Sequence, residues 1–157
     1  MNDKANILIV DDEEVVRLSH MRSLQGADCN ARAAVDGRQA LQVMEQDQFD
    51  VVMLDLRMPG LDGMDVLKTI KQRWPHSEVV VITGYPCLES AKEALRLGAF
   101  DYLAKPLGPA EIVKVAHGAM NQKRWALHTD RDETQSQKAS APTHEHEQEN
   151  EHKFTIH

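Results

Sequence analysis

The chain has 157 residues and a mass of 17.7 kDa, which is enough for one domain of ordinary size plus an extension. Hydrophobic residues make up 41% of the composition, so a core can form, and the formal net charge is -7. An acidic chain is poorly suited to holding phosphate backbones, so we expect no direct nucleic-acid partner. The first apolar run has four residues, too few for a signal peptide or a membrane span. We therefore expect a cytoplasmic protein whose cysteines, Cys29 and Cys87, are reduced.

The first third of the chain alternates predicted strands with predicted helices. Residues 7–10 are all apolar, which is typical of a strand buried on both faces, and a run of acidic residues follows them. Apolar residues at three-residue steps within 15–24 predict the buried face of a helix that ends at Gly26. Residues 29–34 alternate small apolar and polar side chains, as at the edge of a sheet, and Asp36 can cap a short helix after them.

Two more apolar runs, at residues 51–54 and 79–82, predict further strands that are buried on both faces. Between these runs, Asp62 is placed to cap a helix that keeps apolar residues at helical spacing until Pro75 ends it. After the second run, apolar residues within 88–95 predict the buried face of another helix.

An alternating strand at residues 100–104 and a last helix from Pro109 to about Trp125 complete the pattern. Five strands that alternate with five helices imply an α/β fold with a parallel sheet and right-handed crossovers. With the two alternating strands at the edges and helices on both faces, the pattern resembles the flavodoxin-like doubly wound fold, whose strand order is 2-1-3-4-5.

Polar residues dominate the chain from residue 126 onward, and apolar periodicity disappears. We therefore predict a domain at residues 1–125 and a polar, flexible tail at residues 126–157. Within this tail, His144, His146 and His152 lie among glutamates. The segment is either a solvated tail or a weak, pH-sensitive site for a transition metal.

Polar side chains follow four of the predicted strands. Asp11 and Asp12 follow the first, Asp55 the third, Thr83 the fourth and Lys105 the fifth. In the predicted order these four strands lie side by side, and ligands of such sheets bind at the carboxyl ends of the strands. We therefore expect these side chains to converge on one pocket.

Three carboxylates in one pocket repel one another, at a cost on the order of 4 kcal/mol per pair at about 4 Å and an effective dielectric constant near 20. One lysine cannot neutralise three acids, whereas a divalent cation can, and an all-oxygen site suits Mg²⁺. Asp55 could then attack a phosphorus atom in line to form an aspartyl phosphate, with Thr83 and Lys105 binding the transferred group. Each residue alone also has a structural explanation, such as a turn cap, a strand former or a surface charge. The combination is what predicts a phosphate site.

These motifs resemble those of response-regulator receiver domains over residues from about 5 to 123. The matching motifs are the acid pair Asp11-Asp12, LDLRMPGLDG around Asp55, VITGY with Thr83, and FDYLAKP with Tyr102, Lys105 and Pro106.

The resemblance implies a role for each matching residue. In that family the aspartate at the position of Asp55 accepts phosphate from a sensor histidine kinase. The acid pair helps to hold Mg²⁺, and the backbone carbonyl two residues after the acceptor, here Arg57, completes the protein ligands. Thr83 would shift toward the phosphoryl group and Tyr102 would rotate inward, which remodels a face that a downstream protein reads. The resemblance also implies a cis peptide bond between Lys105 and Pro106.

The resemblance to receiver domains also implies how the whole protein would act. Such a receiver catalyses only its own phosphorylation and dephosphorylation, and phosphorylation can drive formation of a homodimer. The sequence of residues 81–106 is similar to the corresponding segment of receivers that precede transcription-activating ATPase domains. The chain has no GxxxxGK[ST] phosphate loop, so we predict a stand-alone receiver that contacts an effector or relays phosphate.

Two other classes of protein remain open at this point. A small Mg²⁺-dependent phosphatase of the haloacid-dehalogenase type also uses an aspartyl nucleophile, but it normally spaces two aspartates one residue apart, whereas Asp11 and Asp12 are adjacent. Flavin binding of the flavodoxin type is the second class, which an absorption spectrum would test.

Overall fold

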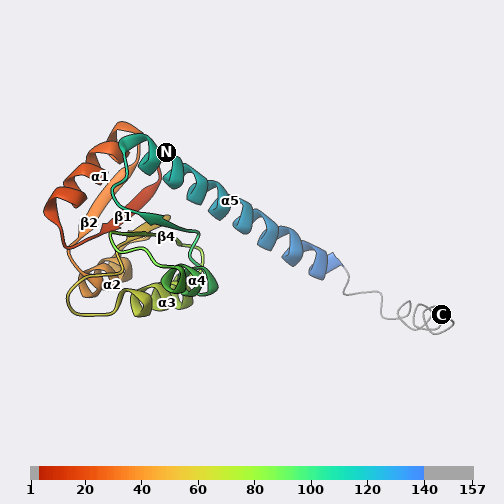
Figure 1. The fold of residues 1–157 in the computed structure, drawn as a ribbon. Coiled ribbons are helices and arrows are strands. Elements are labelled where there is room, and N and C mark those ends of the chain that lie inside the picture. Colours follow the sequence, from red (N-terminus) through yellow and green to blue (C-terminus); the bar gives the residue numbers. More distant parts are fainter. Residues whose placement is uncertain (1–3, 140–157) are drawn as a thin grey trace. The chain divides into compact units, whose positions relative to one another are not determined.

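The computed structural model describes residues 4–139, in which strands and helices alternate along the chain (Figure 1). The chain divides into two compact units, Met1–Arg124 and Trp125–His157. The elements are β1 (Asn6–Val10), α1 (Glu14–Gly26), β2 (Asn30–Ala34), α2 (Gly37–Gln46), β3 (Val51–Leu54), α3 (Gly63–Arg73), β4 (Glu78–Thr83), α4 (Leu88–Arg96), β5 (Asp101–Ala104) and α5 (Pro109–Ala139).

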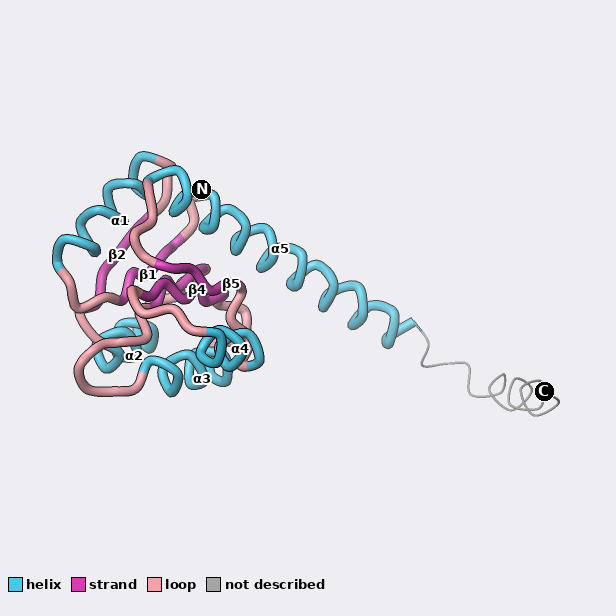
Figure 2. The backbone as a smooth tube through the Cα atoms, viewed as in Figure 1, coloured by secondary structure: helices cyan, strands magenta, loops and turns pink. Residues whose placement is uncertain are grey.

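All strands pair in parallel in one sheet of order β2-β1-β3-β4-β5, which confirms the predicted flavodoxin-like fold. Every residue of β3 and β4 is buried, whereas β2 and β5 at the edges are only partly covered. Helices cover both faces of the sheet, with α1 and the start of α5 on one face and α2, α3 and α4 on the other (Figure 2).

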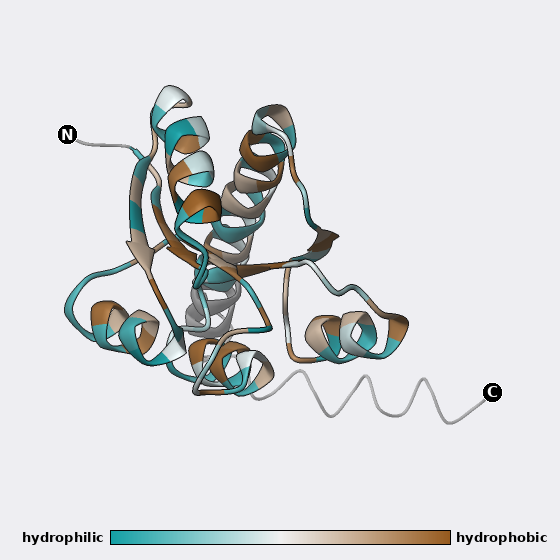
Figure 3. Ribbon diagram, turned by 60° about the vertical axis from the view of Figure 1, so that its left-hand side comes forward, coloured by the Kyte–Doolittle hydropathy of each residue, from teal (hydrophilic) through white to brown (hydrophobic). Residues whose placement is uncertain are grey.

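Alternate residues of the central strands face different helical layers, so the domain has two hydrophobic cores. Figure 3 shows the largely apolar strands of the sheet between the helices. In β1, Leu8 and Val10 pack with α2, α3 and α4, whereas Ile7 and Ile9 pack with α1 and α5. A strand with a core on each face must be apolar throughout, which explains the uninterrupted apolar runs in the sequence.

Side-chain caps fix the starts of three helices. Asp36 accepts a hydrogen bond from the Gln39 amide at the start of α2, and Asp62 accepts one from the Met64 amide at the start of α3, as predicted. The cap of α4 is Cys87, a role that the sequence did not reveal. Both cysteines are free thiols.

The predicted buried faces of α1 and α4 are partly wrong. Val15 and Leu18 of α1 are exposed, whereas Leu24 is buried as predicted and His20, which was not predicted, is buried as well. Residues at successive three-residue steps drift about 60° around a helix at each step, so such a series does not stay on one face. In α4 the predicted residues Leu88 and Leu95 are also exposed, because the helix packs on the sheet through Ala94.

The last helix does not end at about Trp125, as predicted, but continues to Ala139. Residues 126–139 contain neither glycine nor proline and several good helix formers. Loss of apolar periodicity is therefore not a helix stop by itself. The flexibility of a tail at residues 126–157 stays a prediction, and His144, His146 and His152 lie outside the described residues.

Candidate functional site

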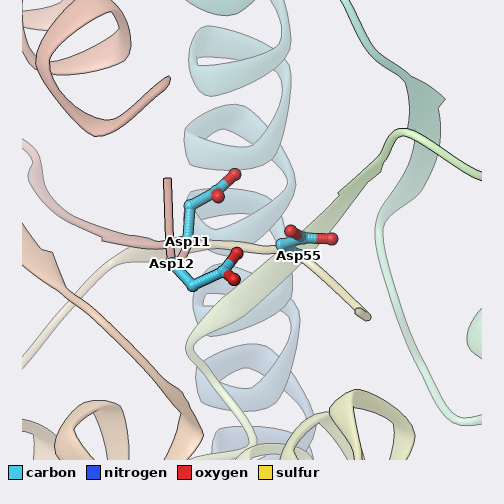
Figure 4. A group of neighbouring side chains, drawn as sticks. All are labelled: Asp11, Asp12 and Asp55. Atoms are coloured by element: carbon cyan, nitrogen blue, oxygen red, sulfur yellow. The ribbon is translucent and has the colours of Figure 1, made fainter. Parts of the chain in front are cut away.

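Three aspartates gather at the carboxyl ends of β1 and β3. Val10 and Leu54 are partners in the sheet, so the next residues, Asp11 and Asp55, lie side by side, and the Asp55 amide donates to the Val10 carbonyl at 3.0 Å. Asp11 and Asp55 are 3% and 5% exposed, whereas Asp12 is open to solvent. One carboxylate oxygen from each acid lies within 4.8 Å of the others (Figure 4).

Lys105 enters this group of acids from the end of β5. Its Nζ lies 2.7 Å from Asp11 Oδ2, 3.2 Å from Asp55 Oδ2 and 3.5 Å from Glu13 Oε1. The Lys105 amide donates to the Thr83 carbonyl at 2.8 Å, which fixes the lysine beside the end of β4. The peptide bond between Lys105 and Pro106 is cis, as the resemblance implied.

Backbone and side-chain hydrogen bonds orient the two buried acids. Asp55 Oδ1 accepts from the Arg57 amide at 3.1 Å, and Asp11 Oδ1 accepts from the Glu13 amide at 3.0 Å. Arg17 of α1 donates to the Asp11 carbonyl at 2.8 Å. The sequence did not point to Glu13 or Arg17, because an acid at a helix start is ordinarily explained by the helix dipole and a lone arginine on a helix by solvent exposure.

The protonation properties of the site follow from burial and charge. Burial raises the pKa of the Asp55 carboxyl, and the Arg57 amide and the Lys105 ammonium oppose this rise. Burial alone would lower the pKa of Lys105, but the hydrogen bond and charge of Asp11, together with Asp55, raise it. Burial lowers the pKa of His20, which lies in the electrostatic field of Asp11 and Lys105. The site therefore holds a permanent ammonium group beside an acid that is costly to ionise.

The three acids are able to hold a metal ion. Their donor atoms are all oxygens, and these oxygens lie close enough together to bind one ion. The ammonium group of Lys105 alone does not balance the charge of three carboxylates. This donor set fits a hard divalent cation. The carbonyl role predicted for Arg57 stays a prediction.

Thr83 and its neighbours line the next part of this edge of the sheet. Thr83 is buried at the end of β4, and its hydroxyl oxygen accepts from the Tyr85 amide at 3.1 Å. A Cβ atom added at Gly84 would lie 3.9 Å from Lys105 Cδ, which is ordinary van der Waals contact, so Gly84 lies directly beside the lysine stem. The Arg57 guanidinium stacks on the ring of Tyr85, with 4.5 Å between Cζ and the ring centroid.

The hydroxyl of Tyr102 is bonded to the start of α4. It accepts from the Cys87 amide at 3.2 Å and lies 2.5 Å from the Ser90 hydroxyl oxygen.

The structure brings most of the predicted site residues together. Lys105 pairs directly with Asp11 and Asp55, and its amide is hydrogen-bonded to the Thr83 carbonyl. Tyr102 is linked to this group through β5 rather than through its hydroxyl.

Comparison with known proteins identifies the family. Residues 7–117 match the model of the response regulator receiver domain. The chain therefore belongs to this family, whose members are signalling modules rather than enzymes that turn over a separate substrate.

Curated relatives match the same part of the chain. The transcriptional regulatory protein ZraR of Escherichia coli is 43% identical over 110 residues, which are 68% of this chain and 24% of ZraR. The DNA-binding transcriptional regulator NtrC of the same organism is 36% identical over 115 residues, 73% of this chain and 24% of NtrC. The chain thus spans about a quarter of the length of these relatives.

Solved structures agree on the fold. A receiver domain protein from Clostridium thermocellum is 32% identical with a TM-score of 0.73, and the match covers 78% of this chain and 98% of that protein. NtrX from Brucella abortus is also 32% identical, with a TM-score of 0.77, and the match covers 82% of this chain and 29% of NtrX. Within residues 4–139, no helix is both long and apolar enough to cross a membrane.

Proposed function

We propose that the protein is a phosphorylation-switched receiver of a two-component system and that Asp55 is its phosphoacceptor. The observation that carries this proposal is the convergence of Asp11, Asp12 and Lys105 on the buried carboxylate of Asp55. A sensor histidine kinase is the expected donor, since that is the partner the receiver family implies.

The transfer can be written with the residues of this chain. One carboxylate oxygen of Asp55 forms a bond to phosphorus, the bond from phosphorus to the imidazole nitrogen of the kinase breaks, and the electron pair leaves with the imidazole. Lys105 lies 3.2 Å from Asp55 and can follow the developing charge. The Thr83 hydroxyl oxygen accepts from the Tyr85 amide, which leaves its own O–H able to donate to a phosphoryl oxygen.

Mg²⁺ is the cofactor we propose for the acid triad. When bound, it would, together with Lys105, offset the charges of Asp11, Asp12 and Asp55 and part of the charge on the phosphoryl oxygens. The backbone carbonyl of Arg57 is proposed as a further ligand.

The signal would leave the pocket through Thr83 and Tyr102. A phosphoryl group adds about 1.5 to 2 negative charges, and a conformation in which Thr83 approaches it would bind it better. A downstream protein partner would read the altered face, and a phosphorylation-dependent homodimer is one form that this readout can take. The chain would act in the cytoplasm, as a receiver that contacts an effector or as a phosphorelay intermediate. No direct contact with nucleic acid is proposed.

The test is phosphorylation by acetyl phosphate, a small phosphodonor, in the presence of Mg²⁺. We expect the intact mass to increase by one phosphoryl group in the wild type and in Asp65→Asn, an exposed acid outside the site. Asp55→Asn should show no stable increase, because its side chain cannot form an aspartyl phosphate. Undiminished labelling of Asp55→Asn would refute the assignment, and the same comparison can be repeated with a phosphorylated kinase.

A further inference from the structure

The hydroxyl of Tyr102 closes a ring of three hydrogen bonds with the first turn of α4. The Cys87 amide lies 3.2 Å from the Tyr102 oxygen, the Ser90 hydroxyl oxygen lies 3.2 Å from the Cys87 carbonyl, and the two hydroxyl oxygens lie 2.5 Å apart. Amide and carbonyl fix the direction of the first two bonds. Either hydroxyl can donate in the bond between Tyr102 and Ser90, and the Ser90 oxygen also lies 3.1 Å from the Cys87 sulfur.

The first turn of α4 depends on this ring because its own cap is weak. A helix start leaves backbone N–H groups without partners, and aspartate, asparagine, serine or threonine usually supplies the acceptor. Here the cap is Cys87, whose sulfur, a weak acceptor, lies 3.5 Å from the Ser90 amide. The Tyr102 oxygen therefore completes the cap of α4 from outside the helix.

We infer that Ser90 and the Cys87 amide form a latch on Tyr102 that opposes the switch of the proposed receiver. This inference rests on the proposed function, in which Tyr102 must rotate. The same structure contains the direct pair between Lys105 and the Asp55 carboxylate, an interaction that a phosphoryl group on Asp55 would have to replace. Rotation of Tyr102 breaks both hydrogen bonds of its hydroxyl. Ser90 is thus a positioning residue, since it acts through Tyr102 and does not touch the pocket.

Opening of the latch would also affect the exposed side of α4. Leu88 follows Cys87 directly and is 70% exposed, and Leu95 on the same helix is 52% exposed. When Tyr102 leaves, the first turn of α4 loses the outside acceptor of the Cys87 amide and becomes easier to rearrange. The latch therefore couples the rotamer of one β5 side chain to a helix that carries two exposed leucines.

The experiment measures the apparent affinity for beryllofluoride, a mimic of the phosphoryl group, in Mg²⁺. Loss of a hydrogen bond of typical net strength shifts an equilibrium about fivefold. Ser90→Ala should therefore bind beryllofluoride about fivefold more tightly than the wild type. Tyr102→Phe should also bind it more tightly, and the double variant should match Tyr102→Phe alone. Ser90→Thr keeps the hydroxyl and should stay close to the wild type.

Hydrogen exchange of the Cys87 amide is the second readout. It should speed up in Ser90→Ala, in Tyr102→Phe and in the wild type with beryllofluoride. Unchanged affinity in Ser90→Ala, or additive effects in the double variant, would overturn the latch while the receiver assignment stands. Failure of the wild type to bind beryllofluoride would instead overturn the proposed function, and the latch with it. A general loss of packing would lower the thermal midpoint of Ser90→Ala without tightening its affinity, and this too would count against the latch.

Discussion

Replacement of Asp55 by asparagine should stabilise the fold when metal ions are chelated. The change removes one of three clustered carboxylates but keeps an oxygen that can accept from the Arg57 amide. Lys105 keeps its pair with Asp11 at 2.7 Å, so the ammonium is not left without a partner. The variant therefore loses a repulsion and the burial of a charge while it keeps the local hydrogen bonds.

The size of the effect follows from the distances. At an effective dielectric constant near 20, the pair of Asp55 and Lys105 at 3.2 Å contributes about 5 kcal/mol, and a carboxylate pair within 4.8 Å costs at least about 3.5 kcal/mol. The attraction is thus largely offset by Asp11 alone, before the cost of burying the Asp55 charge, which is several kcal/mol per ion. We expect Asp55→Asn to gain roughly 1 to 3 kcal/mol in free energy of unfolding, or about 3 to 9 °C in thermal midpoint.

Thermal unfolding with a chelator, across a pH series, measures this gain. Because burial raises the pKa of Asp55 in the fold, the cost of its charge is complete above the folded pKa. The stability difference between wild type and variant should therefore shrink as the pH falls through that pKa. Added Mg²⁺ should raise the midpoint of the wild type more than that of the variant. A midpoint of Asp55→Asn at or below the wild type in chelator would refute this reasoning, and Asp65→Asn is the control for loss of an exposed acid.

Two further predictions concern the loop after Asp55. Arg57→Ala removes the guanidinium that stacks on the Tyr85 ring near the acceptor. Water should then reach the phosphoryl group more easily, and the phosphorylated form should decay faster. An unchanged decay rate would show that this stacked pair does not shield the phosphoryl group. Gly63→Ala should cost more than about 2 kcal/mol in free energy of unfolding, since its Cβ would lie 2.5 Å from the Leu56 backbone. Gly26→Ala, where nothing lies within 4 Å, should be neutral or slightly stabilising in the same denaturant titration.

The sheet could be predicted because its physical cause is local in the sequence. A strand with helices on both faces needs apolar residues throughout, so residues 51–54 and 79–82 stand out. The faces of the helices were harder to predict. On α1 the burial of two residues is the reverse of what hydropathy predicts. The apolar side chain of Val15 is exposed, and the imidazole of His20 is buried. Which side of a helix meets the sheet is decided by tertiary packing, which a spacing of three residues does not fix.

The candidate site was predictable to the extent that topology determines it. Val10 and Leu54 are partners in neighbouring parallel strands, so the residues that follow them must be neighbours. These residues are Asp11 and Asp55. No such rule exists for contacts made by helices. The bonds of Tyr102 to Ser90 and to the Cys87 amide depend on where α4 lies against β5, and nothing in the spacing of these residues encodes that position.

The single lysine of the site explains how charge at Asp55 could become movement at α4. Lys105 is shared between Asp11 and Asp55, and a phosphoryl group with about two charges would compete for it more strongly than a carboxylate. Lys105 follows the end of β5, the strand that carries Tyr102, so a shift of the lysine backbone would act on the strand next to the Tyr102 side chain. The path from acceptor to surface is therefore short and continuous, through the end of β5 to the first turn of α4. The acceptor that caps this turn is a sulfur atom at 3.5 Å, which is a weak acceptor, so we expect movement in the first turn of α4.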